Sequence, residues 1–170
     1  MRASGILMPV FSLPSRYGIG SFSKSAYQFV DMLKKAGQKY WQILPLCPTS
    51  YGDSPYQSFS TYAGNPYFID LDQLIEEKLL TRKECQACDF GDDPQDIDYG
   101  KLYENRFKLL RKAYERANVG EDQEFEAYRR ENAWWLDDYA LFMAVKDRFD
   151  GVAWNEWAEG NYLEPDRKWG

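Results

Sequence analysis

Residues 4–44 read SGILMPVFSLPSRYGIGSFSKSAYQFVDMLKKAGQKYWQIL, and this stretch decides the fold class. Its apolar residues predict a short buried strand over residues 4–11 and a second strand over residues 40–44. Between them, Ser23 is a suitable N-cap for a helix that continues to about Ala36, with apolar residues at helical spacing: Phe22, Ala26, Phe29, Val30 and Leu33. This order predicts two parallel strands joined by a helix, within a larger α/β structure.

The segment after the second strand has an unusual composition. Residues 40–70 contain no Lys, Arg or Glu, and their only charged residues are Asp53 and Asp70. Aromatic residues are interleaved there with Ser, Thr, Gln and Asn: Trp41, Tyr51, Tyr56, Phe59, Tyr62, Tyr67 and Phe68. Flat apolar faces beside neutral hydrogen-bonding groups suit a sugar, which is hydroxylated, uncharged and partly apolar. The alternative is an irregular connection that packs on its own domain.

The position of this segment favours the first interpretation. Ligands of parallel α/β folds bind at the carboxyl ends of the strands. Residues 45–66 begin where the second predicted strand ends. We therefore expect a binding loop there, with Trp41, Tyr67 and Phe68 contributing mainly to the core.

The later half of the chain predicts helices. LDQLIEEKLLT, residues 71–81, predicts one short helix, and Thr81 can cap another. Further helices are expected over residues 101–117, 121–131 and 134–149, and the last of these is apolar on most faces and therefore expected to be buried. The helix over residues 101–117 has a predicted apolar stripe: Tyr103, Phe107, Leu110, Tyr114 and Ala117.

The overall composition excludes several classes of protein. The 170 residues are 28% charged and 44% apolar, which is typical of a folded domain. The net charge of -6 argues against nucleic-acid binding. No apolar run approaches the ~20 residues that span a bilayer, so no membrane association is expected. The N-terminal sequence MRASGILMPVF lacks the pattern of a signal peptide, which predicts a cytoplasmic location.

The titratable residues limit the chemistry. The chain has no His, which excludes a Ser-His-Asp triad, a Cys-His pair and an H-E-x-x-H zinc site within it. Cys85 and Cys88 form a C-x-x-C without a second pair, so we expect neither a metal site nor a redox pair. Acidic neighbours such as Asp137 and Asp138 point in different directions on a helix. No pair of carboxyl groups predicts the two-acid arrangement of glycosyl transfer.

Four stretches closely resemble the amino-terminal part of the 4-alpha-glucanotransferases, the amylomaltases or disproportionating enzymes. They are SGILMPVFSLPSRYGIGSF (4–22), KYWQILPLCPTSYGDSPYQSFSTYAGNPYFIDL (39–71), IDYGKLYENRFKLL (97–110) and ENAWWLDDYALFMAVKDRFDGVAWNEW (131–157). The resemblance implies an alpha-amylase-type (β/α)8 barrel that transfers α-1,4-glucan segments with retention, through a covalent glycosyl-enzyme and without a cofactor or metal. It also implies that the nucleophilic Asp, the acid/base Glu and a further Asp lie in later parts of a longer chain, so no catalytic residue is expected here.

The resemblance also assigns substrate-binding residues. Ser54 and Tyr56 match contacts near the cleaved bond, with Asp53 and Gln57 as adjacent candidates. Tyr51 and Tyr103 match two tyrosines that hold a glucan at a second site. The expected partners are maltooligosaccharides and α-1,4-glucans. Trp134 and Trp135 are expected to be packing residues.

The resemblance divides the chain into three parts. Residues 1–70 begin the catalytic barrel and carry the substrate-binding loop 45–66; residues 71–157 form a mainly helical inserted subdomain; residues 158–170, AEGNYLEPDRKWG, form an atypical tail. A barrel needs at least ~200 residues, so the barrel is expected to be incomplete, to be completed by the rest of an enzyme chain, and to be inactive alone. The alternatives are a stand-alone glucan-binding module and a helical interaction domain.

Overall fold

The computed structural model describes residues 2–50, 52–93 and 95–157. The chain divides into two compact units, Met1–Gln123 and Glu124–Gly170, each described by itself below. The predicted boundary after residue 70 stays a prediction, and the predicted tail lies outside the described residues. The first unit contains β1 (Gly5–Leu7), α1 (Lys24–Lys35), β2 (Tyr40–Gln42), α2 (Leu71–Glu76), α3 (Arg82–Gln86) and α4 (Tyr99–Ala117), with short 3-10 turns η1 (Val10–Ser12), η2 (Pro66–Phe68) and η3 (Val119–Glu121).

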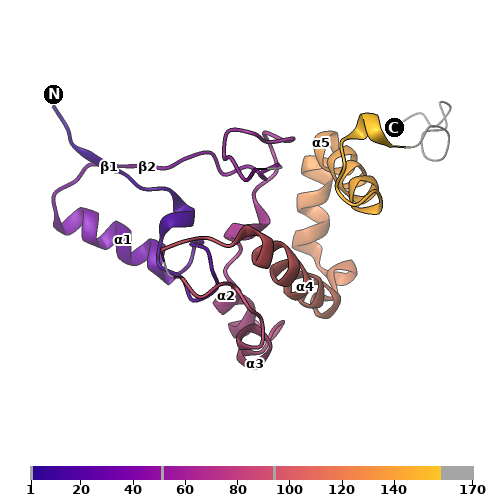
Figure 1. The fold of residues 1–170 in the computed structure, drawn as a ribbon, viewed down its shortest axis with the longest axis horizontal. Helices are drawn as coiled ribbons and strands as arrows, with labels where there is room; N and C mark the ends of the chain where they lie inside the picture. The colour runs from indigo at the N-terminus through magenta and orange to yellow at the C-terminus, as the bar shows by residue number, and fades with distance from the viewer. Residues whose placement is uncertain (1, 51, 94, 158–170) are drawn as a thin grey trace. The chain divides into compact units, whose positions relative to one another are not determined.

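The predicted strand, helix, strand unit is present, and its two strands are parallel. Ile6 lies opposite Trp41 in the register of β1 and β2, which run side by side in Figure 1. The side chain of Ser23 accepts a hydrogen bond from the backbone of Ser25 and caps α1. Gly37, at φ +71°, ends α1 in a left-handed turn of the Schellman type, which favours glycine because it has no Cβ.

The prediction of a buried strand over residues 4–11 was wrong in length and in burial. The last ladder bond runs from the Met8 amide to the Gln42 carbonyl, and Pro9 then offers no N–H. Ile6 and Leu7 are 39% and 56% exposed. A parallel strand is buried only when both faces and both edges are covered, and among the described residues β1 pairs with β2 alone.

Two apolar clusters hold the first unit together. The smaller one joins α1 to the start of the chain and to β2 through Val10, Leu13, Ala26 and Phe68, with Trp41 packed against them. The larger one joins α2, α3 and α4: Tyr17, Ile19, Tyr67, Leu71, Leu80, Cys85, Phe90, Leu102, Leu109 and Ala113. Trp41, Tyr67 and Phe68 therefore contribute to the core, as predicted.

The buried face of α4 differs from the predicted stripe. The helix buries Leu102, Arg106, Leu109 and Ala113, while the predicted stripe residues Tyr103, Phe107 and Tyr114 are exposed. The true core face lies one residue away along the sequence, which is about 100° around a helix. Arg106 is buried because its guanidinium donates to the Ile69 carbonyl inside the unit, and the aromatic rings of the predicted stripe then lie on the surface.

The remaining helices also depart from prediction in their boundaries. Lys78, at φ +63°, lies just beyond α2, so residues 71–81 do not form one helix. Thr81 and Glu84 form a capping box at the start of α3, as the position of Thr81 predicted.

In the second unit, α5 (Gln123–Arg148) replaces the two predicted helices with one, followed by the 3-10 turn η4 (Trp154–Glu156). The expected burial of residues 134–149 was wrong, since α5 has no buried residue among those described. The helix is apolar on several faces, and a single helix can cover only one of them with its own unit. Trp134 and Trp135 were both expected to be packing residues, but Trp134 is 66% exposed. Trp135 is half-buried, its ring centroid lies 6.1 Å from that of Tyr139, and its N–H donates to Asn132.

Arg106 is the buried cation of the first unit. It is 1% exposed, and its Nη2 atom donates a hydrogen bond to the Ile69 carbonyl. Burial lowers the pKa of Arg106 to about 10, although the charge of Asp70 opposes this. Its Nε and Nη1 atoms have no hydrogen-bond partner among the described residues, so the cation is held at a cost in solvation.

We predict that Arg106→Ala lowers the free energy of unfolding by about 3 kcal/mol, because it removes packing and leaves a buried carbonyl unpaired. Arg106→Met should lose less, because it fills the space without a charge. Urea unfolding followed by circular dichroism measures both, with Lys108→Ala as the exposed control on the same helix. A loss in Arg106→Ala no larger than in the control would contradict the assigned role.

Candidate functional site

The loop of residues 45–66 leaves the carboxyl end of β2 and returns to the start of η2. Its two ends are joined by a hydrogen bond of 2.8 Å from the Asn65 amide to the Leu46 carbonyl. The Asn65 side chain accepts from the Tyr67 amide at 2.9 Å and caps η2. These two hydrogen bonds close the loop at its base.

Two hydrogen-bonded turns lie at the tip of the loop, one closed between Ser50 and Asp53 and the other between Ser54 and Gln57. The Asp53 amide donates to the Ser50 carbonyl at 3.0 Å, and the Gln57 amide donates to the Ser54 carbonyl at 3.1 Å. A third bond, from the Ser50 amide to the Gln57 carbonyl at 3.0 Å, closes the pair. These backbone bonds define the tip without help from distant elements.

Ser54 and Tyr56, the predicted contacts near the cleaved bond, lie together on the second turn. The Tyr56 amide donates to Ser54 Oγ at 3.4 Å, which leaves the hydroxyl proton of Ser54 available to a ligand. The Tyr56 side chain is 72% exposed and Gln57 is also exposed. An exposed ring next to a hydroxyl is the arrangement that a sugar face and its hydroxyls need. Tyr51 lies outside the described residues.

Asp53 is partly buried, and it lines a small recess. Its carboxylate accepts a long hydrogen bond of 3.4 Å from Thr49 Oγ1 and lines a small recess with Asn65, Phe68 and Tyr99. Burial raises the pKa of Asp53, while the bond from Thr49 opposes this. The carboxylate is thus placed beneath the loop.

Tyr103 lies on the exposed side of α4. Its side chain is 60% exposed, and its ring centroid lies 5.5 Å from that of Phe107. Phe107 in turn lies 5.7 Å from the buried ring of Tyr67. Burial, followed by the charges of Asp53, Tyr103 and Tyr99, raises the pKa of Tyr67 to about 12. These contacts place Tyr103 at the outer end of an aromatic row that begins beneath the loop.

Sequence reasoning missed Thr49 and Tyr99, which meet Asp53 at the recess. Thr49 lies four residues before Asp53 and Tyr99 is the first residue of α4 after the N-cap Asp98. A Thr just before a Gly-Asp turn is a weak signal of a side-chain hydrogen bond within the loop. Nothing in the spacing of Tyr99 indicates its position.

Other candidate chemistries find no support in the described part of the chain. No group of three or more acids or thiols that could hold a metal is present there. Cys85 is buried in the core, and burial raises the pKa values of both Cys85 and Cys88, which disfavours reactive thiolates. No described helix has the length and apolarity that crossing a membrane requires.

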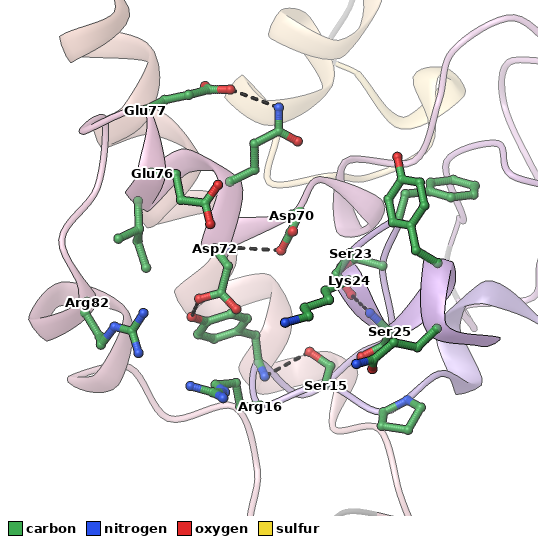
Figure 2. Close-up of a pocket in the computed structure, with 18 residues that line it drawn as sticks. Ser15, Arg16, Ser23, Lys24, Ser25, Asp70, Asp72, Glu76, Glu77 and Arg82 are labelled. Carbon is green, nitrogen blue, oxygen red and sulfur yellow. Dashed lines mark hydrogen bonds between the residues drawn. The ribbon is translucent and has the colours of Figure 1, made fainter. Parts of the chain in front are cut away.

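A larger hollow of the first unit lies elsewhere, between the start of α1 and α2. Figure 2 shows Lys24 extending into it from the start of α1, with the α2 acids Asp72 and Glu76 between Lys24 and Arg82 in this view. Tyr17 closes one wall and donates to Asp72 at 2.6 Å. Acidic and basic groups are mixed there, which is typical of a water-filled surface crevice, and the hollow contains none of the predicted sugar contacts.

The fold and the loop define an α/β segment with an aromatic loop at a strand's carboxyl end. The sequence profile of the 4-alpha-glucanotransferases, glycoside hydrolase family 77, matches residues 8–168. The chain therefore belongs to the 4-alpha-glucanotransferase family.

Individual relatives agree with the family. The 4-alpha-glucanotransferase of Clostridium butyricum is 55% identical over 150 residues, which are 88% of this chain and 31% of the relative. That of Streptococcus pneumoniae is 52% identical over 161 residues, 94% of this chain and 32% of the relative. A solved amylomaltase from Streptococcus agalactiae, in complex with acarbose, superposes with a TM-score of 0.86 at 44% identity, over 94% of this chain and 32% of that one. The chain thus spans about a third of these relatives' length.

The raised pKa of Asp53 predicts a pH effect on stability. A carboxyl group whose folded pKa is raised stabilises the fold below its unfolded pKa of about 3.9 and loses that contribution as pH rises through the folded pKa. We therefore expect Asp53→Asn to gain stability relative to the wild type between pH about 4 and about 7, by less than about 1 kcal/mol because the group is partly solvated. Urea unfolding at both pH values measures the difference. A gain that is equal at both pH values would contradict the burial of the charge.

Proposed function

We propose that this chain is the amino-terminal part of a 4-alpha-glucanotransferase and supplies substrate contacts to it. The complete enzyme transfers α-1,4-glucan segments between maltooligosaccharides with retention, through a covalent glycosyl-enzyme. The observation that carries the proposal is the placement of Ser54 and exposed Tyr56 on one closed turn at the carboxyl end of β2. No metal or cofactor enters the proposed chemistry.

The proposed roles of the residues follow from their surroundings. Tyr56 offers a ring face to a glucose unit, and the Ser54 hydroxyl donates to a sugar oxygen near the cleaved bond. Tyr51 and Tyr103 hold a glucan at a second site. Exposure of Tyr103 supports this role, because its ring is not required to fill the core.

The catalytic carboxylates belong to the part of the longer relatives that this chain does not match. In this proposal β1, α1 and β2 begin a (β/α)8 barrel, and the exposed side chains of Ile6, Leu7 and Tyr40 are covered by later strands and helices. Those exposed apolar residues weigh against a stand-alone glucan-binding module. A cytoplasmic location is part of the same proposal and stays a prediction.

Glucan binding can be tested on the chain itself. We expect maltoheptaose to bind and both Tyr56→Ala and Tyr103→Ala to weaken binding by about tenfold, since each removes an aromatic platform. Isothermal titration calorimetry measures the affinities. Tyr114→Ala is the matched control, because Tyr114 lies on the same helix as Tyr103 and is 61% exposed against 60%. Equal losses in Tyr103→Ala and Tyr114→Ala would contradict a specific site.

Transfer activity is the second test. We expect the purified chain to leave maltotriose unchanged, because retaining transfer needs two carboxyl groups about 5 Å apart. Thin-layer or anion-exchange chromatography detects the products. The appearance of glucose together with longer maltodextrins would show that the chain carries a catalytic pair of its own.

A further inference from the structure

Asp53 joins the two turns of the loop tip in an unusual backbone conformation. Its φ is +54°, in the left-handed region, and Gly52 before it has φ +92°. A non-glycine residue in this region costs free energy, and Asp and Asn tolerate it best because their short polar side chains bond locally. The amide of Asp53 ends the first turn, and Ser54 begins the second. The direction of the second turn, and hence of Tyr56, therefore depends on this one residue.

The side chain of Asp53 is hydrogen-bonded within the loop. The carboxylate accepts from Thr49 Oγ1 and faces the recess beside Tyr99. The titratable groups that its charge reaches are the phenols of Tyr99, on α4, and Tyr67, in η2, and the carboxylate charge contributes to raising the pKa of each after burial. The carboxylate thus has partners within the first unit, at Thr49 and near the two phenols, that do not involve Tyr56.

We propose that Asp53 is a positioning residue of the glucan site: it fixes the joint between the two turns and thereby the placement of Ser54 and Tyr56, without touching the sugar. The inference rests on the proposed function for its ligand, and on the described loop for its mechanism. It replaces the expectation that Asp53 is itself a substrate contact. The strain at the joint is maintained by the closed turns on either side and by the inward anchor.

Three substitutions of Asp53 distinguish a positioning role from direct contact with the sugar. Asp53→Asn keeps both the left-handed preference and the acceptor for Thr49. Asp53→Gly keeps the backbone conformation but removes every side-chain contact that a sugar could make. Asp53→Ala removes the side chain and also penalises the left-handed conformation. Positioning predicts that binding of maltoheptaose changes by less than about twofold in Asp53→Asn, slightly more in Asp53→Gly, and about tenfold in Asp53→Ala. Equal losses in Asp53→Gly and Asp53→Ala would overturn the proposal in favour of direct contact.

A measurement without sugar keeps the test independent of the proposed function. Amide hydrogen exchange, followed by NMR on the whole chain, reports the bonds of the Asp53 and Gln57 amides. We expect both amides to exchange about fivefold faster in Asp53→Ala than in the wild type, and to stay close to the wild type in Asp53→Asn. Unchanged exchange in Asp53→Ala would overturn the proposal. Faster exchange together with no sugar binding by the wild type would overturn the proposed function and leave the joint established.

A substitution at a different residue covers the case in which Asp53→Ala does not fold. Thr49→Val removes the inward anchor and leaves the backbone of residue 53 unchanged. We expect it to speed exchange of the Asp53 amide by about twofold and to weaken glucan binding by a similar factor, since the bond is long. Wild-type exchange and wild-type affinity in Thr49→Val would show that the inward contact does not position the loop, which overturns the proposal.

Discussion

The hydrogen bond from buried Arg106 to the Ile69 carbonyl joins the part of the candidate site on α4 to the segment that follows the loop. It connects α4 to the short segment between η2 and α2. That segment carries Tyr67 at one side and the N-cap Asp70 at the other. Removing a guanidinium from water costs free energy, so its buried position tolerates few alternative partners. A buried polar group of this kind can specify one arrangement of the elements around it. Tyr103, three residues before Arg106 on α4, takes its position from the same contact.

The hydroxyl-rich composition of the loop has a local physical cause, which the sequence alone does not reveal. Many of its hydroxyls bond to the loop's own backbone: Ser60 Oγ accepts from the amides of Tyr62 and Ala63, and Ser58 Oγ both accepts from the Ser60 amide and donates to the Ser60 carbonyl. Such short side chains build tight turns without charged groups. The absence of Lys, Arg and Glu is therefore explained in part by local turn chemistry. Fewer groups remain for a sugar than the composition suggests.

Several parts of the fold that sequence reasoning predicted have local causes. Ser23 caps α1 and Thr81 caps α3, because a cap needs only a few neighbouring residues. The core face of α4 was not predictable in this way. Apolar periodicity places Tyr103 in the core and Arg106 on the surface, but a carbonyl 37 residues earlier in the chain accepts the Arg106 bond and reverses the two. Likewise, the inward direction of Asp53 depends on Thr49 and Tyr99, and Tyr99 is distant in sequence.

The difference between local and long-range contacts also bears on how the exposed side chain of Tyr56 is held in place. Tyr56 is mostly solvated, so its own contacts do little to fix it. A side chain that must be ordered during binding subtracts that entropic cost from the affinity, whereas one held beforehand does not. In this loop three features restrict the backbone that carries Tyr56: the closed turns, the left-handed Asp53 between them, and the base closed by Asn65. Fixing Tyr56 through its backbone leaves its ring face free for contact.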